Sequence, residues 1–153
     1  MKAVFVYLGF ILFLFSCNNN KGKTDVTSEP VHQEHAQEAG SPQVELNNGK
    51  KWKSDPVTNT NITLISQKAE QARHIETKEI SAYNQAGEGM QKQLDKLVSE
   101  CRMKGADHEA LHKWLTPLFS NVSLLKKASN VQEASRLIEE IYNHVNSYSN
   151  YFE

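Results

Sequence analysis

The sequence predicts an all-α protein: an up-down-up-down four-helix bundle that follows a disordered tether. Over roughly the last 100 residues, apolar side chains recur every three to four positions, which is the helical period. No stretch shows the strict alternation that is typical of a half-buried strand. Short connections separate the periodic stretches and favour antiparallel neighbouring helices. The expected domain covers residues 50–153, a size that can fold alone around one core.

Residues 1–16 have the features of a signal peptide. Lys2 is positively charged, and the apolar run that follows it, residues 3–15, is too short to span a membrane. Leu14-Phe15-Ser16-Cys17 resembles the lipobox of bacterial lipoproteins. This resemblance implies cleavage before Cys17 and a lipid attached to its sulfur, and several acyl chains together anchor a protein stably at a membrane. The alternatives are an ordinary secretory signal and an uncleaved anchor.

The residue after the lipidated cysteine indicates the membrane at which the protein is located. Some Gram-negative lipoproteins carry Asp there as an inner-membrane retention signal, whereas this chain has Asn18. We therefore expect a lipid-anchored protein of the cell envelope, at the outer membrane and facing the periplasm. A domain that faces the outside is the alternative.

The stretch from residue 17 to residue 49 is predicted to be the lipidated cysteine and a disordered tether. It is polar and contains Gly22, Pro30, Gly40 and Pro42 with few large apolar side chains. Such a composition buries too little apolar surface to offset the entropy of ordering. We expect this stretch to hold the folded domain away from the lipid.

The first two helices are predicted from their apolar stripes. The first begins after the polar run Asn59-Thr60-Asn61, and the second has a frayed beginning marked by Gly87 and Gly89. The first stripe consists of Ile62, Ile65, Ala69 and Ala72, and the second of Met90, Leu94, Leu97, Val98 and Cys101. Gly105 is expected to end the second helix in a tight turn.

The last two helices are predicted in the same way. Asp107 is the expected N-cap of the third helix and Asn130 that of the fourth, while Pro117 is expected to kink or break the third near Thr116. The third stripe consists of His108, Leu111, His112, Leu115, Leu118, Phe119, Val122 and Leu125. The fourth consists of Val131, Ala134, Ile138, Ile141, Val145, Tyr148 and Phe152.

Cys101, His108 and His112 are the main candidates for chemistry. If Cys17 carries lipid, Cys101 has no partner within the chain for a disulfide, because these are the only two cysteines. In an antiparallel pair that turns near residues 104–105, Cys101 lies level with His108, and His112 follows one turn deeper. The same topology puts His144 near the level of His112 and lets the start of the first helix, with Trp52, close this end of the bundle.

The side chains in this cluster suit a copper or zinc ion. Imidazole and thiolate are ligands for both metals, and a thioether shifts the preference toward copper. The predicted ligands are Cys101, His108 and His112, with Met103 or His144 as a fourth group. No carboxylate-rich cluster favours calcium or magnesium. The structural alternative is that all these residues simply fill the end of the core.

Other chemistries have weaker support. The Cys-x-x-Cys-His motif of covalent haem is absent, although Met90 or Met103 with His144 could hold haem non-covalently. Cys101 with His108 as base could act as a nucleophile, but no oxyanion hole or substrate cleft is recognisable, so we expect no enzyme and identify no small-molecule substrate. A further alternative is an intermolecular disulfide through Cys101.

The charge pattern narrows the class of partner. The formal net charge is −1, and no basic stripe with interleaved aromatic residues is present, so nucleic acid is not an expected partner. Membrane lipid, through Cys17, is the expected one. The alternative to metal binding is a non-catalytic helical module that docks an envelope protein, in which Cys101, His108 and His112 are purely structural.

Two segments of the C-terminal two thirds carry a resemblance. They are Leu46-Asn47-Asn48-Gly49-Lys50-Lys51-Trp52-Lys53 and the pattern Cys101-x-Met103-Lys104-Gly105-x-x-His108-x-x-Leu111-His112. Together they resemble small helical lipoproteins of Gram-negative bacteria. That group lies in some cases near heavy-metal efflux functions, which implies a role in metal handling.

Overall fold

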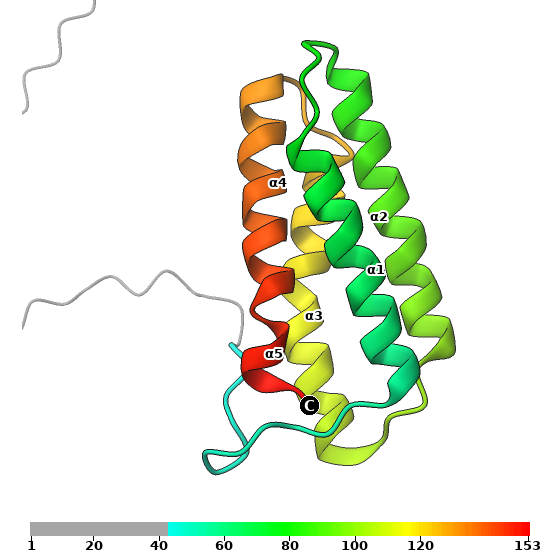
Figure 1. The fold of residues 1–153 in the computed structure, drawn as a ribbon, viewed down its shortest axis with the longest axis vertical. Helices are drawn as coiled ribbons and strands as arrows, with labels where there is room; N and C mark the ends of the chain where they lie inside the picture. The colour runs from blue at the N-terminus through cyan, green and yellow to red at the C-terminus, as the bar shows by residue number, and fades with distance from the viewer. Residues whose placement is uncertain (1–42) are drawn as a thin grey trace, which may run out of the picture. The chain divides into compact units, whose positions relative to one another are not determined.

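In a computed structural model of the chain, residues 43–153 are described, and they are all-helical (Figure 1). The predicted signal peptide, Cys17 and most of the predicted tether lie outside the described residues. The helices are α1 (Pro56–Arg73), α2 (Ile80–Glu100), α3 (Gly105–Leu125), α4 (Val131–Asn146) and the single turn α5 (Tyr148–Tyr151). None of these helices is both long and apolar enough to cross a membrane.

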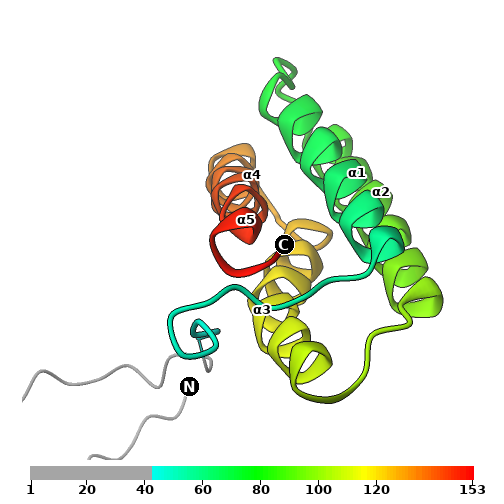
Figure 2. The ribbon, with the colours of Figure 1, turned by 60° about the horizontal axis from the view of Figure 1, so that its bottom comes forward.

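The four long helices lie side by side around one apolar core (Figures 1 and 2). Each packs against its neighbours: α1 against α2 and α4, and α3 against α2 and α4, while α2 and α4 also meet across the centre. The fully buried side chains come from all four predicted stripes and include Ile65, Leu94, Leu118 and Ile141. The apolar period therefore identified the core correctly. Val98, which is about half exposed, and His112, which is also exposed, are exceptions.

Helix α1 begins earlier than the sequence suggested, and the predicted start at Asn59-Thr60-Asn61 is wrong. Asp55 is the N-cap: its Oδ1 accepts a hydrogen bond of 2.6 Å from the Thr58 backbone N–H. Pro56 follows at the first helical position, where its missing N–H costs nothing. Asn61 is instead buried inside the helix, where its side chain bonds to Glu100 Oε2 at 3.0 Å.

Helix α2 also begins earlier than predicted, at Ile80, so Gly87 and Gly89 lie within it. The end of α3, at Leu125 and Lys126, packs directly against the backbone of α2 at Gly87. A Cβ atom at residue 87 would lie 3.0 Å from Lys126 N and 3.2 Å from Leu125 Cγ. The close approach requires glycine at this position, whereas a Cβ at Gly89 would meet nothing nearer than 4.0 Å.

The α2–α3 junction differs from the predicted turn. Glu100 ends α2, and Gly105 begins α3 with φ of +63° instead of ending the helix before it. Asp107 lies in the first turn of α3 and is not its N-cap; its Oδ1 accepts a 2.9 Å hydrogen bond from the Lys53 N–H. Pro117 does not break α3, which continues to Leu125. Helical spacing could not reveal that Asp107 bonds to Lys53, which lies far away in the sequence.

Helix α4 starts where predicted. Asn130 caps it, with Oδ1 accepting a 2.9 Å hydrogen bond from the Glu133 N–H. The predicted stripe continued without interruption to Phe152, but α4 ends at Asn146 and the chain turns through Ser147 into α5. Phe152 is still buried, because α5 folds back over the end of the core.

Residues 50–55, which we call the crossing segment, run across the end of the domain that holds the α2–α3 connection and the C-terminus (Figure 1). The Trp52 N–H donates to Tyr151 O at 2.8 Å, and the Ser54 N–H donates to Glu153 O at 2.9 Å. In return the Glu153 N–H donates to Trp52 O at 3.0 Å. The expectation that Trp52 closes this end of the bundle is confirmed.

The fold also includes residues that we assigned to the tether. Val44 is buried in the core, and the Trp52 indole N–H donates to the Glu45 carbonyl at 2.6 Å. The boundary expected between residues 49 and 50 therefore comes too late. Val44 is one apolar side chain in a polar stretch, so no periodicity marked it as part of the core.

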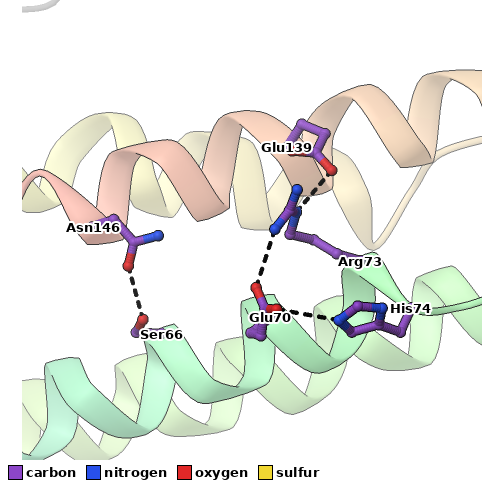
Figure 3. Close-up of polar contacts among 6 residues, drawn as sticks. All are labelled: Ser66, Glu70, Arg73, His74, Glu139 and Asn146. Atoms are coloured by element: carbon purple, nitrogen blue, oxygen red, sulfur yellow. Dashed lines mark hydrogen bonds and ion pairs between the residues drawn. The ribbon is translucent and has the colours of Figure 1, made fainter.

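Polar contacts join α1 and α4 on their outer side (Figure 3). Arg73 Nε donates to Glu139 Oε1 at 2.9 Å, and its Nη1 donates to Glu70 Oε2 at 3.2 Å. Further along, Ser66 Oγ donates to Asn146 Oδ1 at 3.1 Å. These groups are largely exposed, and exposed ion pairs contribute little stability. Alignment of α1 and α4 depends mainly on the buried stripes.

Replacing Asp55 with alanine should lower the free energy of unfolding by about 1–2 kcal/mol, the range for loss of a helix N-cap. The variant also loses the 2.8 Å hydrogen bond that Asp55 Oδ2 accepts from the Arg102 N–H. Asp55→Asn keeps one acceptor and should lose less. Urea unfolding followed by circular dichroism measures both. An Asp55→Ala midpoint equal to that of the unchanged protein would contradict this assignment.

The two glycines of α2 provide a matched pair of tests. Gly89→Ala should raise the free energy of unfolding by up to about 1 kcal/mol, because alanine favours the helix and the site has room. Gly87→Ala should lower it by about 1–3 kcal/mol, because its Cβ would press on the Lys126 backbone. Thermal and urea unfolding measure both, and a stabilising Gly87→Ala would refute the close approach.

Candidate functional site

Three of the predicted site residues line one hollow. Cys101, His108 and His112 surround a space of about 180 Å³ between the end of α2 and the first half of α3. Leu97, Val98, Leu111 and Leu115 complete the wall. Helical spacing predicted that Cys101 lies level with His108 and that His112 follows one turn deeper, and the structure brings all three to the same hollow.

The two histidines form the closest contact in the hollow. They are four residues apart on α3, and one helical turn puts their side chains on the same face. His108 Nε2 lies 3.0 Å from His112 Nε2, with ring centroids 4.4 Å apart. At this distance one nitrogen donates a proton and the other accepts it. The Nε2 lone pairs of both rings can instead face one ion, which then lies where the hydrogen-bonded proton was.

Cys101 is a free, half-buried thiol at the C-cap of α2. Its backbone N–H donates to Leu97 O at 2.9 Å, so the last turn of α2 sets its position. The next residue, Arg102, donates its N–H to Asp55 Oδ2 at 2.8 Å. The backbone at Cys101 and Arg102 is thus held by α2 and by the crossing segment.

The pKa of Asp55 reflects the backbone hydrogen bonds that its carboxylate accepts. Burial raises the pKa of the carboxyl group, but hydrogen bonds from the Thr58 and Arg102 N–H groups outweigh that effect and leave the pKa below its ordinary value. The carboxylate is therefore charged at neutral pH. A charged acceptor makes stronger hydrogen bonds to backbone N–H than a neutral one.

The geometry of the cluster is looser than that of a closed metal centre. Within residues 43–153, no three His, Cys, Asp or Glu side chains come close enough together to hold an ion. The close pair is His108 with His112, and Cys101 lines the same hollow. This arrangement provides two imidazole nitrogens in ligand-like proximity and one thiol nearby.

The structure does not bring the fourth candidates to this hollow. Met103 Sδ accepts a hydrogen bond from Ser54 Oγ at 3.7 Å, so its thioether faces the crossing segment. His144 Nε2 lies 2.8 Å from Trp114 O, and its ring stacks on the Trp114 indole at 4.7 Å. The level expected for His144 was close, because its side chain contacts α3 at Trp114, two residues after His112, but it does not line the hollow.

His144 belongs to an aromatic cluster with Trp114, Tyr148 and Phe152. Tyr148 meets Trp114 edge-on at 5.0 Å and stacks on Phe152 at 4.7 Å. Burial raises the pKa of Tyr148 to about 12, and its hydroxyl lies 2.6 Å from Ser54 Oγ. This cluster seals the core beneath the crossing segment. A haem iron on His144 Nε2 would have to displace its contact with Trp114 O.

A second and larger hollow was not foreseen. It has a volume of about 410 Å³ and lies between residues 43–52 and the first half of α3. Glu45, Trp52, Glu109 and Lys113 are among its walls. The only sequence signal was the Asn48-Gly49 dipeptide, which is typical of a tight turn before a strand-like segment.

No protein-family model, curated protein or solved structure matches this chain. A proposal of function therefore starts from the geometry of the described residues and from the N-terminal sequence pattern.

His144 should make stability depend on pH. Burial lowers its pKa, and the hydrogen bond to Trp114 O opposes this effect only in part. Since the folded pKa lies below the unfolded value of about 6.5, the folded state loses stability relative to the unfolded state as pH falls below about 6.5. His144→Gln should lose less free energy of unfolding than the unchanged protein between pH 8 and pH 5. Urea unfolding at both pH values measures this, and equal losses would contradict it.

Proposed function

We propose that this chain is a cell-envelope lipoprotein, anchored through a lipid on Cys17, whose helical domain binds a copper or zinc ion as a buffer, chaperone or sensor. The proposed ligands are His108 and His112, with Cys101 as the third. The observation that carries the proposal is the 3.0 Å separation of the two Nε2 atoms in the hollow that Cys101 lines.

The separation of the two imidazoles suits one shared ion. Zinc–nitrogen bonds are about 2.0–2.1 Å long, so two nitrogens roughly 3 Å apart can bind the same ion without moving apart by more than a few tenths of an ångström. Imidazole binds both copper and zinc. When the ion binds, the Nε2 proton of the donating ring moves to its Nδ1, because the ligand nitrogens must be deprotonated, and protonation of either ring competes with the ion. Affinity should therefore fall as pH falls.

Cys101 supplies the third ligand in this proposal. A thiolate added to two imidazoles raises affinity for zinc and for copper. The thiol sits on the α2–α3 connection, outside the regular part of either helix. In this proposal the connection moves toward α3 so that the Cys101 sulfur reaches the imidazole pair, and metal binding provides the free energy for that movement.

The anchor and the topology belong to the same proposal. The lipobox-like motif at residues 14–17 supports lipidation, and the polar residues after it support a tether that lets the domain face the periplasm from the outer membrane. Short connections and the packing of consecutive helices support an up-down-up-down bundle. In that arrangement the end with Cys101 is also the end where the tether enters.

Metal binding by the full-length protein, purified in detergent under reducing conditions, tests this function. We expect about one copper or zinc ion per chain, and at least a tenfold loss of affinity in His108→Ala and in His112→Ala. Cys101→Ser should weaken binding less than either. His74→Ala is the matched control, because His74 is an exposed histidine at the C-cap of α1 that contacts Glu70 instead. Elemental analysis and competition with a chromogenic chelator measure these affinities.

A second proposed function is a non-catalytic interaction module that docks an envelope protein, in which Cys101, His108 and His112 are purely structural. Under this alternative, the His108, His112 and Cys101 variants change only the free energy of unfolding. Equal metal retention by the unchanged protein and by a Cys101→Ala, His108→Ala double variant would reject metal binding and leave the docking module.

A further inference from the structure

The larger hollow lies on a different flank of α3 from the candidate metal site. It is enclosed by residues 43–52 on one side and by α3 on the other, with a volume of about 410 Å³. It shares no lining residue with the hollow of Cys101, His108 and His112. A volume of this size is within the range of small-molecule sites.

The local backbone explains why this hollow exists. Asn47 and Lys50 exchange two backbone hydrogen bonds of 2.8 and 3.0 Å, and the two residues between them have positive φ, +51° at Asn48 and +80° at Gly49. That turn, together with the bond from the Trp52 indole N–H to Glu45 O, fixes residues 45–52 as a loop beside α3. The floor opposite the loop is made of small α3 residues, including the buried Ala110.

The rim of this hollow carries charges of both signs. Glu45, Glu109 and Lys113 line it. Glu109 and Lys113 are four residues apart on α3, a spacing that favours an ion pair, yet the ion pairs of residues 43–153 include neither of them, nor Glu45. Among the described residues these three exposed charges therefore have no ion-pair partner and can interact with a bound molecule, while the half-buried Trp52 offers apolar surface beside them.

We propose that this hollow binds a zwitterionic ligand of amino-acid to dipeptide size. Its ammonium group lies between Glu45 and Glu109, its carboxylate meets Lys113, and an apolar side chain packs on Trp52. A neutral sugar would leave the three protein charges without partners. An anion such as a nucleotide would face two protein carboxylates, Glu45 and Glu109, and only one ammonium group, that of Lys113. A zwitterion satisfies both signs at once, and charge-assisted hydrogen bonds are the stronger kind. This site does not depend on metal binding.

The test uses the full-length protein in detergent and the dipeptide Ala-Phe with free termini. Nuclear magnetic resonance titration should give saturable shifts of the Trp52 indole and of the Glu109 and Lys113 amide signals. Removing one charge from the ligand, by N-acetylation or by C-terminal amidation, should weaken binding at least threefold in each case. The His108 and His112 signals should not shift.

Protein variants then assign each charge. Lys113→Gln should weaken binding of the free dipeptide at least threefold but leave binding of its C-terminal amide unchanged. Glu109→Gln should weaken the free dipeptide and leave the N-acetyl form unchanged. Lys92→Gln, at an exposed lysine on α2 outside the hollow, is the matched control and should change nothing.

Two results would overturn this site. One is the absence of saturable shifts in Trp52 and α3 with the free dipeptide, and the other is equal weakening of the acid and the amide by Lys113→Gln. Circular dichroism of each variant shows whether it is folded, so a loss of binding can be attributed to the changed charge. Neither result bears on the copper or zinc proposal, which concerns other residues.

Discussion

Two carboxylates hold the crossing segment against the end of the helices, and the rest of this end of the domain depends on them. Asp55 accepts hydrogen bonds from the N–H groups of Thr58 and Arg102, which ties the start of α1 to the α2–α3 connection. Asp107 accepts from the Lys53 N–H and ties the same segment to α3. The bond to Thr58 lies at a buried residue, where an unpaired backbone N–H group would be costly because no water could replace the carboxylate.

This constraint links the two hollows on either side of α3. The connection that carries Cys101 is held by Asp55, and the loop that encloses the larger hollow leads directly into the crossing segment. Both sites are therefore made partly from residues outside the helices, on a rigid helical frame. Loops positioned by a rigid frame are common places for binding residues. The lipidated tether that we propose would enter the domain at this end too.

The apolar stripes and the candidate cluster were predictable because helical spacing alone decides which residues share a face. His108 and His112 had to meet, being one turn apart, and Cys101 had to lie near them once α2 and α3 were neighbours. His144 was misplaced because level along a bundle does not specify direction around α4, and there the stacking of its ring on Trp114 decides. Met103 was misplaced because its partner, Ser54, lies far away in the sequence.

The sequence by itself determined the helical class, the four stripes that make the core and the pairing of two imidazoles on one turn, because each follows from the 3.6-residue period. Only the tertiary structure decided where α1, α2 and α3 begin, that Val44 joins the core, and that a charged hollow opens beside α3. The physical reason is that these features depend on hydrogen bonds and close approaches between residues far apart in the chain. A carboxylate such as Asp107 can cap its own helix or accept from a distant backbone, and local spacing does not distinguish the two.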